Sequence, residues 1–68
     1  MITREYVVKA WNGMGQRELG AYATRAEANV ALERERTTAR ARGFWTLGMC
    51  ERPNGSTWAD RVLFTLAL

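Results

Sequence analysis

Apolar and polar residues alternate with a period of two near both ends of the chain and follow a helical period in its middle. The segment Ile2–Trp11 is rich in β-branched and aromatic residues, and its alternation predicts a strand. Asn12-Gly13 follows, and this dipeptide favours a tight hairpin turn because both central positions of that turn need positive φ. Gln16–Tyr22 is short and polar, which is typical of a strand at a sheet edge. The first part of the chain therefore predicts a β-hairpin.

The segment Thr24–Gly43 predicts a single helix with signals at both ends. Thr24 and Glu27 have the spacing of a capping box, and Gly43 stands where a left-handed residue commonly ends a helix. At 100° per residue, the stripe expected to face a sheet is made mostly of small residues: Ala28, Ala31, Leu32 and Ala39. A second thin stripe on the outer side contains Ala26, Val30, Thr37 and Ala41.

The rest of the chain predicts a second hairpin. Phe44–Arg52 is the third expected strand, and Thr57–Leu68 is the fourth, after a turn around Asn54-Gly55. The last seven residues are apolar on both faces apart from Thr65, which favours a central position in the sheet. The prediction is a single α+β domain over residues 1–68. Its four-stranded, mainly antiparallel sheet has element order β-β-α-β-β and strand order 2-1-4-3, with the helix packed on one face.

The size and composition of the chain limit what can stabilise it. At 68 residues the core is small, and a core of this size rarely supplies more than about 3–5 kcal/mol. One cysteine allows no internal disulfide, and the lack of histidine makes a zinc site unexpected. We therefore expect oligomerisation or binding to a larger partner. No apolar run approaches the roughly 20 residues of a membrane span and no signal-peptide pattern is present, so a cytoplasmic protein without membrane contact is expected.

Candidate catalytic chemistry is sparse. There is no histidine for acid–base work, and Cys50 lacks the histidine partner that a cysteine nucleophile usually has. Cys50 is interpreted as a small, buried or half-buried side chain of a strand. No phosphate-binding loop, dinucleotide fingerprint or calcium loop occurs. The chain is therefore predicted to be no enzyme and to need neither cofactor nor metal.

Arginines supply the first candidate binding surface. Nine of the ten basic residues are arginine, and the net charge is +3. Arg36, Arg40 and Arg42 share one sector of the helix, and no acid follows Glu35 until Glu51. Like charges at i,i+4 repel by a few tenths of a kcal/mol, so an anion facing them would be favourable. The simpler interpretation is a solvated helix face.

Tryptophans supply the second candidate. Trp45 and Trp58 are expected in the core, because a small domain needs large core residues. Trp11 precedes a turn and alternates onto the face away from the helix. With Val7 and Leu63 it is expected to form an exposed apolar patch, and such patches usually mark interfaces.

The chain resembles two kinds of protein. Residues 6–32, with Thr24, Glu27 and Ala28 at a T-x-x-E-A helix start, look like the arm-binding modules of phage-type integrases, although the usual lysine-rich strands are missing. The whole chain is similar to small phage-encoded anti-CRISPR proteins in length, layout, lack of catalytic residues and charged surface. That likeness implies a phage or mobile-element inhibitor that sterically blocks a larger host complex, such as a CRISPR effector.

Three functions follow from these patterns. The first is a non-catalytic protein that binds a larger protein or ribonucleoprotein partner through Arg36, Arg40 and Arg42, with Trp11 as a further contact. The second is a nucleic-acid-binding module that uses the same arginines on phosphates. The third is a homodimer that pairs through sheet faces or edge strands.

Overall fold

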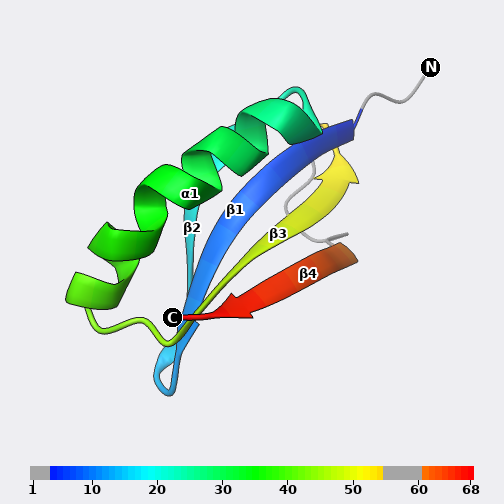
Figure 1. Ribbon diagram of the computed structural model, residues 1–68. Coiled ribbons are helices and arrows are strands. Elements are labelled where there is room, and N and C mark those ends of the chain that lie inside the picture. Colours follow the sequence, from blue (N-terminus) through cyan, green and yellow to red (C-terminus); the bar gives the residue numbers. More distant parts are fainter. Residues whose placement is uncertain (1–3, 55–60) are drawn as a thin grey trace.

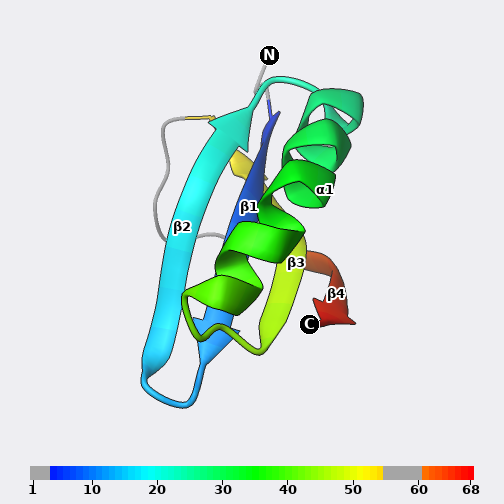
Figure 2. The same cartoon turned by 60° about the vertical axis from the view of Figure 1, so that its left-hand side comes forward.

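The computed structural model describes residues 4–54 and 61–68. Its elements follow in the order β1 (Arg4–Asn12), β2 (Gly15–Tyr22), α1 (Arg25–Ala41), β3 (Thr46–Pro53) and β4 (Arg61–Ala67). The four strands form one antiparallel sheet, and α1 lies across one face of it (Figures 1 and 2). The predicted α+β class and element order are confirmed. Residues 2–3 and 57–60 of the expected strands, Trp58 among them, and Gly55 of the expected turn lie outside the described part.

The strand order is β2-β1-β3-β4, so the predicted order 2-1-4-3 is wrong. The chain leaves the first hairpin, crosses the sheet through α1 and returns beside β1 as β3 (Figure 1). β4 then turns back along the outer side of β3 and pairs with it. Four consecutive residues of β3, from Leu47 to Cys50, are buried, as expected for a strand covered on both faces. The apolar composition of β4 therefore does not reflect a central position.

Both predicted caps of α1 are present. The Thr24 hydroxyl oxygen accepts from the Glu27 N–H at 3.2 Å, and the hydroxyl donates to the Glu27 carboxylate at 3.0 Å. In a capping box the Glu27 carboxylate would accept from the Thr24 main-chain N–H, but here it accepts from the Thr24 hydroxyl. At the other end Gly43 has a φ of 88°. Its N–H donates to the Arg40 carbonyl, and the Phe44 N–H donates to the Ala39 carbonyl, which is the Schellman arrangement.

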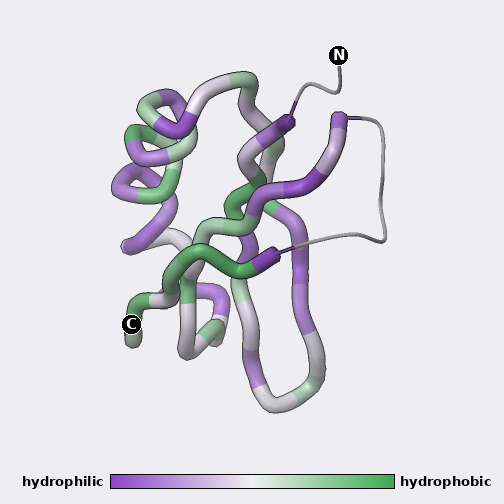
Figure 3. Tube along the Cα trace, turned by 90° about the vertical axis from the view of Figure 1, so that its right-hand side faces the viewer, coloured by the Kyte–Doolittle hydropathy of each residue, from purple (hydrophilic) through white to green (hydrophobic). Residues whose placement is uncertain are grey.

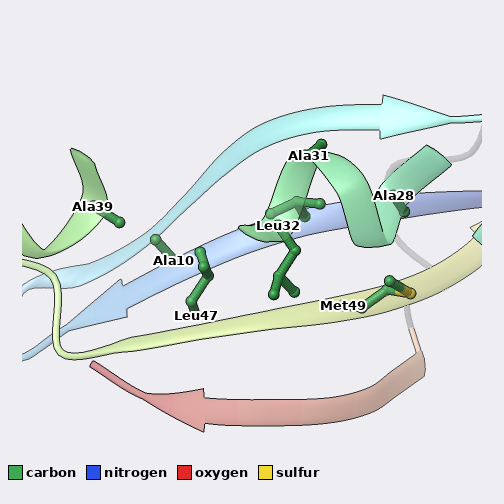
Figure 4. Close-up of a cluster of buried hydrophobic side chains, with 8 residues drawn as sticks. Ala10, Ala28, Ala31, Leu32, Ala39, Leu47 and Met49 are labelled. Atoms are coloured by element: carbon green, nitrogen blue, oxygen red, sulfur yellow. The ribbon is translucent and has the colours of Figure 1, made fainter. Parts of the chain in front are cut away.

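The helix packs on the sheet through small side chains. The predicted stripe of Ala28, Ala31, Leu32 and Ala39 is buried, and this prediction is confirmed. The stripe meets a buried set from the two central strands (Figure 4): Val8, Ala10, Leu47 and Met49. Half-buried larger side chains surround this cluster: Tyr6, Leu19, Tyr22, Phe44, Leu63, Phe64, Leu66 and Leu68. The one large side chain that α1 contributes to the buried cluster is Leu32.

An ion cluster lies on the face of the sheet away from the helix. Arg52 of β3 bonds to Glu5 of β1, with 2.5 Å between Nε and Oε1, and to Glu18 of β2, with 2.7 Å between a terminal nitrogen and Oε1. These bonds hold the guanidinium charged and raise the pKa of Arg52 above its ordinary value, the bond to Glu18 contributing most. The three residues tie three adjacent strands together.

This cluster explains why the expected patch of Val7, Trp11 and Leu63 is wrong. To reach Glu18, the Arg52 side chain crosses β1 between Glu5 and Lys9, over the position of Val7. Val7 is accordingly 0% exposed. Leu63 packs instead against the buried hydrophobic cluster on the helix side of the sheet. Cys50 is buried on this second face, as expected.

Replacing Thr24 by alanine is expected to lower the free energy of unfolding by about 1 kcal/mol, because the first turn of α1 loses its side-chain cap. Thr38→Ala is the matched control, since Thr38 is exposed inside the same helix and alanine is the better helix former. Urea denaturation of both variants measures the difference. Equal stability of the two variants would contradict the capping role of Thr24.

Candidate interaction site

Arg36 and Arg40 lie together along a groove between the second half of α1 and the end of β4. The groove has a volume of about 360 Å³ and is lined by Glu33, Arg36, Thr37, Arg40, Ala67 and Leu68. It exists because α1 lies over β1, β2 and β3 but stops short of β4 (Figure 2). One wall is therefore a charged helix face, and the other is the apolar end of a strand.

The charge of this groove is less one-sided than the sequence suggests. An Arg36 terminal nitrogen lies 3.3 Å from a Glu33 carboxylate oxygen, one helical turn back. Both side chains are about half exposed or more, so this pair contributes a few tenths of a kcal/mol at most. Arg40 makes no ion pair with the described part of the chain. Arg40 is thus the less compensated of the two cations.

Arg42 does not join them. It is the C-cap of α1, and its N–H donates to the carbonyls of Thr38 and Ala39 at 3.0 and 3.2 Å. Its side chain is exposed and does not line the groove. The predicted grouping of all three arginines in one sector does not hold, because at about 100° per residue a side chain at Arg42 points roughly 160° away from that at Arg40.

Trp11 lies on the other face of the sheet, apart from the arginines. Its indole N–H donates to the Gln16 side-chain oxygen at 3.0 Å. The ring lies against Gly48 of β3, because a Cβ at that position would come within 2.9 Å of the ring and 2.7 Å of the Phe64 carbonyl oxygen. Trp11 is half-buried in this seat. Trp11 therefore packs on the face of the sheet away from the helix and does not lie together with Arg36 and Arg40.

Trp45 is 66% exposed, so its expected core position is wrong. It precedes the first residue of β3 and belongs to the connection from α1, where strand alternation does not apply. Its ring lies over the β1–β2 turn, 3.1 Å from the place a Cβ on Gly13 would take. Met14, on the same turn, is 95% exposed. Two exposed apolar side chains, Trp45 and Met14, thus lie where the turn and the connection meet, a feature that the sequence pattern did not indicate.

No family model, curated protein or solved structure matches this chain. Among the described residues, α1 is too short and too polar to cross a membrane.

Proposed function

We propose that this chain is a non-catalytic interaction protein whose groove between α1 and β4 binds a larger protein partner. The observation that carries the proposal is the pairing of two exposed guanidinium groups with an apolar wall in one groove. Arg36 and Arg40 would pair with carboxylates of the partner, and Ala67 and Leu68 would receive an apolar side chain beside them. Planar guanidinium groups suit such bidentate contacts.

The composition of the groove favours an acidic protein surface over nucleic acid. Glu33 lines the same groove and bonds to Arg36, so the groove presents mixed charge, which suits a protein surface with a few carboxylates better than a polyanionic phosphate chain. Apolar Ala67 and Leu68 offer nothing to a sugar–phosphate backbone, whereas they can cover an aliphatic or aromatic side chain. Phosphate-binding surfaces are instead marked by cations in series and by strong salt dependence.

The resemblance to small anti-CRISPR proteins suggests a physiological setting for this binding. In that setting the chain acts in the cytoplasm of a host cell as a phage or mobile-element inhibitor. It occupies a surface of a larger complex, such as a CRISPR effector, and blocks it sterically. Such a role needs affinity and bulk but no catalytic group, cofactor or metal.

The double charge reversal Arg36→Glu with Arg40→Glu is expected to weaken partner binding about tenfold or more, because charged interfacial pairs become repulsive. The fold should persist, since both side chains are exposed. The matched control is Arg25→Glu with Arg34→Glu, which changes the net charge equally at exposed helix positions outside the groove. Titration calorimetry against the purified partner measures both. Equal loss of affinity in the two double variants would contradict the site.

A further inference from the structure

Strand β4 combines an apolar sequence with an edge position. Arg61 is its one charged residue, and the tube in Figure 3 is hydrophobic along most of its length. Eight half-buried apolar residues pack around the core, and four of them lie in the segment 63–68: Leu63, Phe64, Leu66 and Leu68. Within the described residues β4 pairs with β3 alone, and α1 does not cover it. Long apolar edges are templates for pairing with another strand, and proteins usually protect them with charges.

The free main-chain groups of this edge can be assigned. The Leu68 N–H donates to the Trp45 carbonyl at 2.8 Å, so Leu68 points its main-chain groups toward the β3 side. In an antiparallel ladder the direction alternates, so the main-chain groups of Thr65 and Ala67 point outward. Met49 pairs with Phe64 and Cys50 pairs with Val62, which leaves Leu63 as an extra residue in β4. That bulge interrupts the edge, so the regular stretch available for pairing is 64–68.

We infer that this edge pairs with β4 of a second copy of the chain, antiparallel and centred on Leu66. In this register Thr65 of one copy and Ala67 of the other form a hydrogen-bonded pair, and the two-fold axis repeats it. Leu66 then faces its own symmetry mate, and Phe64 faces Leu68. The four main-chain bonds use the groups that point outward in the single chain.

The side-chain pattern is self-complementary about this centre. Phe64, Leu66 and Leu68 share the helix side of the sheet and contact the core there. Pairing therefore sets apolar side chains directly against apolar side chains, which stabilises antiparallel strands. Arg61 lies beyond the bulge, so no charge opposes a like charge across the axis. A partner strand of another protein would have no reason to match this symmetric pattern.

The second copy also adds buried apolar surface, of which a single chain of this size has little. The buried cluster contains four alanines among its eight members, so each chain buries little apolar volume of its own. An axis perpendicular to the sheet keeps both helices on one side of a continuous eight-stranded sheet. The uncovered helix-side surface of each β4 then lies beside that of its mate. This inference does not rest on the proposed function, because it needs no further partner.

Sedimentation of the wild-type chain from micromolar to millimolar concentrations is the first test, together with amide hydrogen exchange. A dimer is expected, in which exchange at the Thr65 and Ala67 amides slows as concentration rises. Ala67→Pro removes an outward N–H that β3 does not use, and proline is tolerated at such edge positions. It should weaken the dimer about tenfold or more, since two hydrogen bonds are lost per dimer. Ala67→Ser keeps the N–H and should dimerise like the wild type.

A wild-type chain that stays monomeric throughout the range would overturn the inference. So would a dimer that Ala67→Pro leaves intact, or one in which exchange at Thr65 and Ala67 does not respond to concentration. If Ala67→Pro fails to fold, the exchange measurement on the wild-type chain decides alone. Loss of partner binding in the Arg36 and Arg40 variants with an unchanged dimer would separate this inference from the proposed function.

Discussion

Replacing Arg52 by methionine is expected to lower the free energy of unfolding by about 2–3 kcal/mol. Removing one partner of a buried ion cluster leaves uncompensated charge, which typically costs about 3–5 kcal/mol. Here the Arg52 side chain is 9% exposed but that of Glu18 is 43% exposed, so water solvates part of the residual charge. Methionine keeps an apolar stem over Val7, so the change isolates the guanidinium. Guanidinium chloride is unsuitable because it screens charge, and urea denaturation is the appropriate measurement.

Two further variants sharpen this prediction. Arg4→Met breaks the pair between the exposed Arg4 side chain and Glu51, whose nitrogen and oxygen atoms lie 3.1 Å apart. Arg61 still lies 3.7 Å from the Glu51 carboxylate, so stability should change by less than about 0.5 kcal/mol. Arg52→Lys keeps the positive charge but loses the planar guanidinium group that reaches two carboxylates. Its loss of stability should therefore fall between those of Arg4→Met and Arg52→Met. Similar losses for Arg4→Met and Arg52→Met would contradict the cluster's role.

The sign of the pH dependence follows from the raised pKa of Arg52. A cation whose pKa is higher in the folded state contributes stability that is fully present below its unfolded pKa. That contribution is lost only as the pH rises through the folded pKa. The stability difference between wild type and Arg52→Met should therefore stay constant across the alkaline range below the ordinary arginine pKa.

Replacing Leu32 by alanine is expected to cost about 3 kcal/mol. Leu32 is 2% exposed, and its neighbours in the buried stripe of α1 are alanines that cannot expand into the space it leaves. Leucine-to-alanine changes in cores cost about 2–5 kcal/mol, through lost burial and the cavity left behind. Since a domain of this size is rarely stable by more than about 3–5 kcal/mol, the variant should be largely unfolded at 37 °C.

Val30→Ala is the matched control for Leu32, because Val30 belongs to the outer stripe of the same helix and is 67% exposed. It should change stability by less than about 0.5 kcal/mol. Thermal denaturation followed by circular dichroism compares the two. A cooperative Leu32→Ala transition close to that of the wild type would contradict the assignment of Leu32 as the helix's anchor on the sheet.

The features predicted correctly from the sequence are those set by local chemistry. Thr24, Glu27 and Gly43 mark the ends of α1 through bonds within a few residues, and the period of the helix selects the stripe around Leu32. The strand order failed because apolar composition was taken as evidence of a central place. An edge strand that pairs with another chain would have the same composition, so the pattern of β4 cannot separate the two cases.

The site was predictable only on its helical side. Arg36 and Arg40 meet because residues four apart share a helix face, whereas Ala67 joins them through a pairing of distant strands. Arg42 was wrongly grouped with them, because residues two apart on a helix, such as Arg40 and Arg42, point in nearly opposite directions. The ion cluster of Arg52 depends on which strands become neighbours, and no local spacing encodes that.

The central claim is that this chain binds a larger protein through the groove between α1 and β4. Its most direct test is capture from nuclease-treated host lysate, with the wild-type chain and the Arg36→Glu, Arg40→Glu double variant side by side. We expect the wild-type chain to capture one protein, alone or as the protein part of a ribonucleoprotein, after nuclease treatment. The double variant should fail to capture it. Equal capture of this protein by both chains would contradict the claim, and so would a wild-type chain that captures no protein once nuclease has removed the nucleic acid.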